Sequence, residues 1–444
     1  MDGDDPASMA TRALYLCYFG MREPLVQTQV LPYLHQLVAA GVEVHLLTFE
    51  AELARSWTAG DLESRRARLA AGGIRWECLP YHKRPSLPAT LYDIAAGARR
   101  ATQIVRGHDV DIIHARSHVA AAMGATAKRR TGRPLVFDIR GFLPEEYVDA
   151  GVWPAGGLLY RLVKAAERRL LAAADGFVVL TEKARDILFT GGAQSDPAGR
   201  PVEVIPCCVD LKRFESAGTA SRERVRRELK LEGRRVVVYV GALGGWYLTE
   251  EMADFLAAAH EQDEGTFSLI LTQSPPEMIG KLLRERGVVD GDVLIRRVSP
   301  VQVPEYLSAA DIALSFIKPC YSKLSSSPAK LAEYLAAGLP VVCNAGIGDV
   351  DEVIEGDRVG VIVRGMRRED YHEALRAVEA LRREADLPAR CRASALARFD
   401  LESVGGARYR RLYRRVLHDE RRAESRASNP PSEAGQRVRR EGSP

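Results

Sequence analysis

A serine-rich turn followed by a short apolar helix is the part of this sequence with the clearest potential for chemistry. It reads SSSPAKLAEYLAAGLPVV and spans residues 325–342. Serine before proline is a typical helix start, so the pattern predicts Ser327 as the cap and Pro328 as the first helical residue. The free N–H groups and partial positive charge at such a helix end favour a bound phosphate. We therefore expect Ser326 and Ser327 to contribute to an anion site.

Lys330 and Glu333 lie one turn apart on this predicted helix, on the side opposite the apolar residues expected to pack on a sheet. A lysine in the first turn opposes the helix dipole, and a bound anion would compensate for it. Glu333 sits one turn deeper, where its carboxylate can accept two hydrogen bonds from vicinal hydroxyls such as those of a ribose. The residues alone also allow a structural interpretation, in which Lys330 and Glu333 form an exposed ion pair. Such a pair stabilises a helix by only roughly a few tenths of a kcal/mol.

Two runs of alternating strands and helices must position this segment. The first run has apolar strands predicted at 13–19, 42–49, 111–116, 134–140, 176–180 and 202–206. The second has strands predicted at 234–241, 268–272, 292–298, 311–316, 340–343 and 359–363. Strand–helix–strand units of this spacing favour parallel pairing. The sequence therefore predicts an α/β fold of two Rossmann-like, doubly wound parallel-sheet domains that face each other across an interdomain cleft.

The chain, at 444 residues, is too long for one core, and its composition shifts suggest the boundaries. We expect an N-terminal domain over 13–205 and a C-terminal domain over 206–395. A C-terminal helix over 396–420 is expected to fold back on the N-terminal domain. The polar ends, residues 1–12 and 421–444, are expected to be disordered.

Ligands of doubly wound sheets bind beyond the carboxyl ends of the strands, which selects further candidates. Arg140 ends a predicted strand and could neutralise a diphosphate or grip an anionic acceptor. The alternative is a structural ion pair of Arg140 with Asp138 or Glu145. His114 is a weaker catalytic candidate, because a lone histidine is more often structural.

Glycines follow two of the predicted strands. Gly20 ends the first strand, and with Gln29 in the next helix it is a candidate for the acceptor side. Gly241, Gly244 and Gly245 follow the first strand of the second domain, where the backbone could approach a phosphate closely. The same glycines could equally form a plain strand–helix turn.

Several classes of protein are disfavoured by composition and by missing motifs. A net charge of +4, from 63 basic and 59 acidic residues, is too balanced to indicate nucleic-acid binding. The sequence contains no Walker motif, no Gly-x-Gly-x-x-Gly and no Gly-x-Ser-x-Gly, which disfavours kinases, nicotinamide dehydrogenases and hydrolases. No histidine–carboxylate cluster has metal-ligand spacing, so no metal is expected.

The expected location is the cytoplasm. No apolar run reaches the ~18 residues of a membrane helix. Seven scattered cysteines and an acidic, polar N-terminus fit a reducing compartment. The arginine-rich segment 408–422 leaves open a peripheral contact with the inner face of a membrane, the alternative being a solvated helix that folds back over the first domain.

The segment that opened this section, together with VPEYLSAADIALSFIKP (303–319), resembles the donor-binding region of the retaining GT-B glycosyltransferases of family 4, the glycosyl transferases group 1. The matching positions are Glu333, Gly338, Pro340, Val341 and Val342. VIPCCVDLKRF (204–214) is similar to the segment that joins the family's two domains, with Cys208 where glycine is usual. The resemblance covers about residues 13–417.

This resemblance implies an enzyme that moves a sugar from a nucleotide-diphosphate donor to a hydroxyl of a glycan, lipid-linked or small-molecule acceptor, with retention. The nucleotide sugar is then a substrate and no cofactor is expected; the N-terminal domain would bind the acceptor. The implied catalytic residues are Arg140, Lys330 and His114. The implied donor-binding residues are Glu333, Ser326, Ser327, Lys323, Gly241, Gly244, Gly245 and Val298.

The sequence also departs from the family pattern. The family commonly has a second carboxylate eight residues before Glu333, where this chain has Ser325. Ala242 and Tyr247 stand where an Arg and a Lys usually hold the diphosphate. The missing cation must come from Lys330, Lys323 or Arg140, in that order of preference. Two alternatives stay open: a nucleotide-sugar 2-epimerase of the same fold, and a non-catalytic partner subunit.

Overall fold

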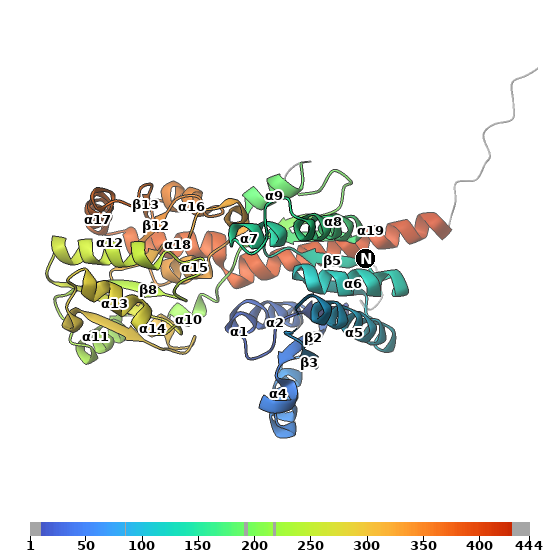
Figure 1. Ribbon diagram of the computed structural model, residues 1–444. Helices are drawn as coiled ribbons and strands as arrows, with labels where there is room; N and C mark the ends of the chain where they lie inside the picture. Colours follow the sequence, from blue (N-terminus) through green and yellow to red (C-terminus); the bar gives the residue numbers. More distant parts are fainter. Residues whose placement is uncertain (1–9, 85, 191–193, 216–218, 429–444) are drawn as a thin grey trace, which may run out of the picture.

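The computed structural model describes residues 10–84, 86–190, 194–215 and 219–428. It contains two parallel-sheet α/β domains, which confirms the predicted fold class (Figure 1). Residues 1–9 and 429–444, where disorder was predicted, lie outside the described residues. The last helix continues to Ser428, so the part of the predicted disordered tail that is described is helical.

The first domain holds a seven-stranded parallel sheet in the order β3-β2-β1-β4-β5-β6-β7. Its strands are β1 (Arg12–Cys17), β2 (Glu43–Ala51), β3 (Ile74–Tyr81), β4 (Ile112–Arg116), β5 (Leu135–Asp138), β6 (Gly176–Val179) and β7 (Val202–Val204). Its helices include α1 (Pro24–Gln29), α2 (Leu31–Ala39), α4 (Ala59–Ala71), α5 (Ser86–Gly107), α6 (Ser117–Thr131), α7 (Leu143–Asp149), α8 (Leu158–Ala173) and α9 (Glu182–Leu188). The strand order reverses between β1 and β4, and ligands of such sheets bind at this switch point.

Sequence reasoning assigned six strands to this domain and missed β3. The strand lies at the edge of the sheet, and only Ile74 and Trp76 among its residues are buried. An edge strand with one wetted face lacks the signal by which buried parallel strands are recognised.

The second domain holds a six-stranded parallel sheet in the order β10-β9-β8-β11-β12-β13, with every strand near its predicted position. The strands are β8 (Arg235–Val240), β9 (Thr266–Leu271), β10 (Val293–Arg296), β11 (Ile312–Ser315), β12 (Val341–Asn344) and β13 (Gly360–Val363). The elements that matter below are α10 (Lys212–Glu215), α12 (Thr249–Gln262), the 3-10 helix η2 (Tyr321–Ser325), α15 (Ala329–Ala336), α16 (Val350–Gly356) and α18 (Leu387–Phe399).

The chain crosses between the domains twice, and the two crossings are bonded to each other. The Val209 amide donates to the Phe399 carbonyl at 2.8 Å, and the Leu401 amide donates to the Val209 carbonyl at 3.0 Å. The helix α19 (Ala407–Ser428) then runs back along the first domain (Figure 1). Its Tyr409 and Tyr413 join the apolar core of that domain. No helix in the described ranges is long and apolar enough to cross a bilayer.

Candidate functional site

The serine turn is fixed by the segment that joins the two domains. Pro328 is the N-cap of α15, so the prediction that Ser327 caps this helix is wrong. The Ser327 hydroxyl instead accepts a hydrogen bond from the Cys207 amide at 3.1 Å. The turn is therefore bonded to the segment around Cys207 that joins the two domains, called the hinge below. The first N–H groups of α15 receive no side-chain cap.

Lys330 is buried rather than outward-facing, which rules out the alternative of an exposed Lys–Glu pair. Its side chain lies between two tyrosines, with Nζ 3.1 Å from the Tyr239 hydroxyl and 4.2 Å from the ring centres of both Tyr239 and Tyr247. Burial lowers the pKa of Lys330 to about 7, against the opposing charge of Glu333. Within the described residues no carboxylate forms an ion pair with Lys330. The site thus holds a desolvated amine that Glu333 influences only from beyond ion-pair distance.

Glu333 lies half-buried on the same side of α15. Its carboxylate makes no hydrogen bond or ion pair with any residue in the described part of the chain. Burial raises the pKa of this group, while the charges of Arg213 and Lys330 oppose the rise. Its oxygens are therefore free to accept hydrogen bonds from a ligand.

The glycines after β8 leave the space that Lys330 occupies. Gly241 has φ +141°, and a Cβ added there would lie 2.8 Å from Lys330 Nζ. Gly244 and Gly245 both have left-handed backbones, and the Gly244 amide donates to the Thr249 hydroxyl at 2.8 Å, at the start of α12. Val298 is buried beyond β10, where its carbonyl accepts from the Gln273 side chain.

Lys323 is committed to a contact between the domains. Its Nζ lies 3.1 Å from the Glu146 carboxylate on α7 and 4.0 Å from the ring centre of Trp246. Ser325, in place of the family carboxylate, accepts a hydrogen bond from the Phe142 amide at 3.2 Å. η2 is thereby tied to the first domain, and Lys330 is left as the candidate cation without an acidic partner.

Arg140, two residues after β5, forms an ion pair with Asp138, the last residue of that strand. Its Nη2 donates to Asp138 Oδ2 and to the Tyr409 hydroxyl, both at 2.7 Å. Of the two ion pairs that the residues left open, the Asp138 pair forms, while Glu145 pairs with Lys164. Burial opposes ionisation of Asp138, but the Arg140 charge is among the contacts that keep the pKa of this carboxyl below its ordinary value.

His114 cannot touch a substrate in this structure, because its exposed fraction is 0%. Nδ1 lies 2.9 Å from the Tyr413 hydroxyl of α19, and Nε2 lies 3.4 Å from Asp138 Oδ2. Burial lowers the pKa of His114, so the imidazole stays neutral around pH 7. In this structure the side chain is therefore placed beside Asp138 rather than where it could contact a substrate.

The two acceptor-side candidates separate in the structure. Gly20 lines a cavity of about 390 Å³ together with Trp57 and Tyr81, and a Cβ at Gly20 would lie 2.7 Å from Glu50 Oε2. Gln29 is buried instead, and its Nε2 donates to the Cys208 carbonyl at 3.2 Å. Gly20 thus lies at an opening, whereas Gln29 braces the hinge.

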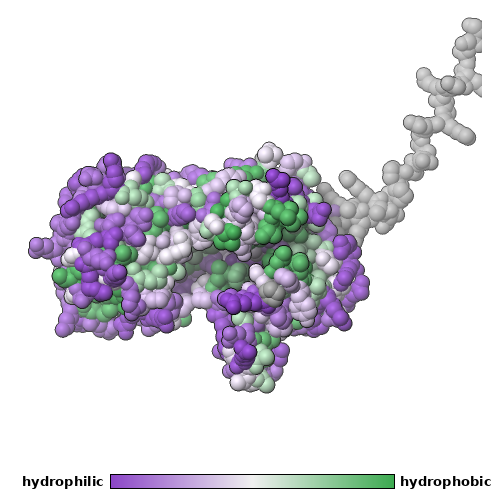
Figure 2. Space-filling view, in the orientation of Figure 1, coloured by the Kyte–Doolittle hydropathy of each residue, from purple (hydrophilic) through white to green (hydrophobic). Residues whose placement is uncertain are grey.

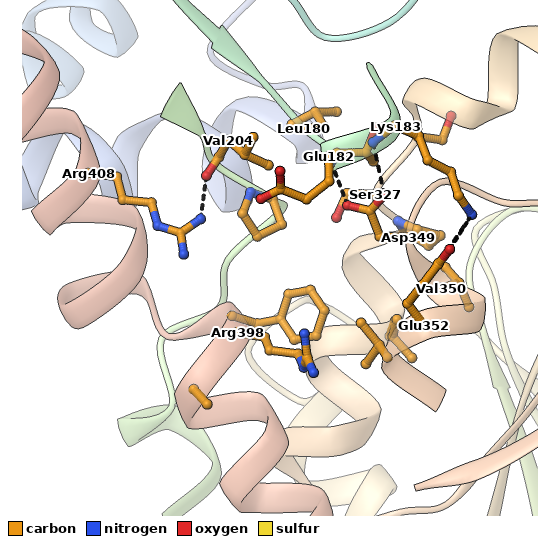
Figure 3. Close-up of a pocket in the computed structure, with 18 of the residues that line it drawn as sticks. Leu180, Glu182, Lys183, Val204, Ser327, Asp349, Val350, Glu352, Arg398 and Arg408 are labelled. Carbon is orange, nitrogen blue, oxygen red and sulfur yellow. Dashed lines mark hydrogen bonds and ion pairs between the residues drawn. The ribbon is translucent and has the colours of Figure 1, made fainter. Parts of the chain in front are cut away.

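A second cavity of about 390 Å³ lies between the domains, behind the serine turn (Figure 3). Ser326 and Ser327 line it from the second domain, and Glu182 and Lys183 from the first. Across it, the Asp349 carboxylate accepts from the Glu182 amide at 2.7 Å, at the start of α9. The serine turn therefore borders an opening, and the surface is also hollowed between the domains in Figure 2.

The serine turn thus lines the interdomain cavity, whereas Lys330, which lies between Tyr239 and Tyr247, is not among the residues that line it. A model of the glycosyl transferase 4-like domain matches residues 26–208, and a model of the glycosyl transferases group 1 matches residues 221–398. The chain therefore carries a glycosyl transferase 4-like domain followed by a glycosyl transferases group 1 domain. No set of three or more His, Cys, Asp or Glu side chains within the described ranges is placed to hold a metal ion.

Curated relatives carry glycosyltransferase names. The D-inositol 3-phosphate glycosyltransferase of Acidothermus cellulolyticus is 28% identical over 293 residues, which are 63% of this chain and 62% of that protein. The protein of the same name from Actinosynnema mirum is 26% identical over 305 residues, 66% of this chain and 70% of that protein. The alignment with the first of these spans less than two thirds of its length.

Solved structures agree on the fold. Sucrose-phosphate synthase of Thermosynechococcus elongatus superposes with a TM-score of 0.69 at 17% identity, over 92% of this chain and 100% of that one. Anabaena HepE in complex with UDP superposes with a TM-score of 0.61 at 15% identity, over 94% and 100%. The predicted GT-B fold is confirmed.

Sequence reasoning missed several residues of the site. Tyr239 was not marked by any local pattern, and Tyr247 was noted only for the cation that it replaces; together they enclose Lys330. Tyr409 reaches Asp138 from a position 271 residues later, so no local pattern could place it there.

Proposed function

We propose that this chain transfers a glycosyl group from a nucleoside-diphosphate sugar to an acceptor hydroxyl with retention of configuration. One observation carries the proposal: a buried lysine and a half-buried glutamate, both without ionic partners, share one side of α15 beside a glycine turn. Lys330 would meet the diphosphate, and Glu333 would accept hydrogen bonds from the ribose hydroxyls. The solved HepE complex with UDP supports a uridine nucleotide as a ligand to test.

The transfer then depends on stabilising charge as the donor breaks. The bond between the sugar's anomeric carbon and the diphosphate oxygen breaks, and its electron pair stays on the diphosphate. Lys330 and the uncapped start of α15 stabilise that charge. The acceptor oxygen attacks from the same face and its proton passes to the leaving diphosphate. Ser325 has no carboxylate to form a covalent intermediate, which favours this direct route.

The acceptor is best sought among small polar molecules. Relatives named for the transfer to D-inositol 3-phosphate favour a phosphorylated polyol over a glycan or a lipid. The cavity beside Gly20 is lined by Arg22, Lys83 and three glutamates, so its side chains offer hydrogen bonds to hydroxyls rather than a net positive charge for the phosphate.

A panel of nucleotide sugars, scored by the rise in melting temperature of the full chain, tests the donor assignment. A binder at a hundred times its Kd stabilises the native state by about 2.7 kcal/mol, which such a scan resolves. We expect one nucleotide base to give the largest shift and the matching sugar to be consumed when an acceptor is added. Binding without turnover would favour a non-catalytic subunit, and turnover without any acceptor would favour an epimerase. If no nucleotide or nucleotide sugar shifts the melting temperature, the proposal fails.

Nucleotide affinity should depend on pH through Lys330. Its pKa of about 7 in the free protein rises when an anion reaches Nζ, because the anion favours the charged form. Below pH 7 the amine is already charged, so affinity is flat. Above pH 7 binding must take up a proton, and affinity for UDP should fall up to about tenfold per pH unit. Calorimetric titrations at pH 6.5, 7.5 and 8.5 measure this, and a Lys330→Met variant should show no such slope.

A further inference from the structure

The segment that joins α7 to α8, together with the first turns of α8, forms an exposed apolar surface on the first domain. Residues 150–160 read AGVWPAGGLLY and contain no charged side chain, although 27% of the chain is charged. Val152, Leu158 and Leu162 are 61%, 75% and 56% exposed. Figure 2 shows hydrophobic residues gathered over α8, beside the hollow between the domains. The α7–α8 surface, as it is called below, consists of Tyr147, Val152, Trp153, Leu158, Leu159 and Leu162. Exposed apolar patches of this kind mark places that a partner or a membrane covers.

Hydrogen bonds within the segment hold this surface in one shape. The Val152 and Trp153 amides both donate to the Tyr147 carbonyl, at 2.9 and 3.1 Å, and the Arg161 amide donates to the Gly157 carbonyl at 3.0 Å. The Tyr147 and Trp153 rings stack with their centres 4.2 Å apart. An ordered surface loses little conformational entropy when it is covered. Tyrosine and tryptophan are also the side chains that favour the boundary between lipid and water.

The exposed charges of α8 are all positive. Arg161, Arg168 and Arg169 are exposed. Arg161 and Arg168 follow the first leucine of the helix at three and ten residues, so they lie on the same face as that leucine. The one acidic residue of α8, Glu167, is buried and forms an ion pair with Lys164. The outer face of this helix therefore presents leucines at its start and unbalanced arginines further along.

This charge pattern selects the occupant of the surface. A twofold contact between two copies of the chain uses the same surface of both, so it would place the α8 arginines of one copy near those of the other. No exposed acidic residue of α8, which is described throughout, could balance them. An anionic lipid surface complements both features, because it accepts apolar side chains at the level of the acyl chains and attracts arginines at its headgroups.

We propose that the α7–α8 surface docks on an anionic membrane, with its leucines inserted among the lipids and the α8 arginines at the headgroups. The docking does not rest on the proposed function and assigns no lipid acceptor. The surface directly adjoins the contact between the domains, since the Asp149 carboxylate at the end of α7 accepts from the Ser322 amide of η2 at 2.8 Å. A docked enzyme would therefore hold its interdomain opening close to the lipid surface.

Flotation of the full chain with lipid vesicles tests the docking. The probe is vesicles of phosphatidylcholine mixed with phosphatidylglycerol, and vesicles of phosphatidylcholine alone are the comparison. We expect the wild type to prefer the mixed vesicles and to bind them more weakly as salt is raised. The double variant Leu158→Ser/Leu162→Ser should bind them at least about tenfold more weakly, because burial of a single leucine side chain already contributes about that factor. Arg161→Gln/Arg168→Gln should weaken binding to the mixed vesicles by about fivefold for each arginine.

Val289→Ser/Leu396→Ser is the matched control, because it removes two exposed apolar side chains from the second domain. It should bind vesicles as the wild type does, and the leucine variant should melt at the wild-type temperature because both of its leucines are exposed. Equal vesicle binding by the wild type and the leucine variant, or a loss that the control shares, would overturn the docking. A wild type that ignores the mixed vesicles but forms a dimer that the leucine variant cannot form would also overturn it, and would assign the surface to a second copy of the chain. Failure to bind nucleotide sugars counts against the proposed function alone, because flotation needs no nucleotide.

Discussion

Replacing Lys330 with methionine is expected to lower kcat for sugar transfer by about a hundred- to a thousandfold, the loss typical when one donor to a developing oxyanion is removed. Methionine keeps the apolar stem that lies between Tyr239 and Tyr247. Because the native amine is desolvated and unpaired, its removal should not destabilise the fold. The measurement is initial-rate kinetics with the donor found in the nucleotide panel.

Lys281→Met is the control for this variant, since Lys281 is an exposed lysine of the same domain whose ion pair with Glu285 is long, at 3.6 Å. The control should keep wild-type kinetics. A Lys330→Met enzyme with kcat within threefold of wild type would show that the diphosphate charge is stabilised elsewhere. Arg140 would then be the next residue to examine, although its Nη2 is already bonded to Asp138 and Tyr409.

Replacing Glu333 with alanine is expected to abolish the thermal shift by nucleotide sugars while the unliganded melting temperature stays unchanged. The carboxylate contributes no hydrogen bond within the described chain, so the fold loses nothing when it is removed. Two hydrogen bonds to ribose hydroxyls, each about 1.5–3 kcal/mol when the acceptor is charged, amount to about a hundredfold or more in affinity.

Glu251→Ala on α12 is the matched control, because that glutamate is also half-buried and lies in the same domain. It should respond to nucleotide sugars as the wild type does. A Glu333→Ala protein that still responds fully would remove the ribose from this carboxylate. A Glu333→Gln variant should fall between the two, since an amide oxygen accepts hydrogen bonds without charge.

The second domain was largely predictable because its signals are local. Each of its strands is a short apolar run between helices, and the serine turn, Lys330 and Glu333 belong to one continuous segment. What the sequence could not predict was the direction in which Lys330 points. Helical periodicity placed it away from the sheet, but the turn at Gly241 makes room for it between two tyrosines.

The first domain was predictable only in outline, because its key contacts join distant segments. His114 meets Tyr413 across 299 residues, and Asp138 meets Tyr409 across 271. The pattern at each strand end indicated a charged cluster, but it did not tell which charges were cancelled. Arg140 pairs with Asp138 at hydrogen-bond distance, and the Tyr409 hydroxyl that α19 brings to this pair is bonded to both residues.

The first domain cannot complete its core until the last helix, α19, has been synthesised. Leu412, Tyr413 and Val416 fill the interior of a unit whose first strand is translated some four hundred residues earlier. Until that helix is made, the sheet face that it shares with α2 is covered only in part. Separately expressed halves should therefore fold poorly. Substitutions in α19 should lower the stability of the first domain.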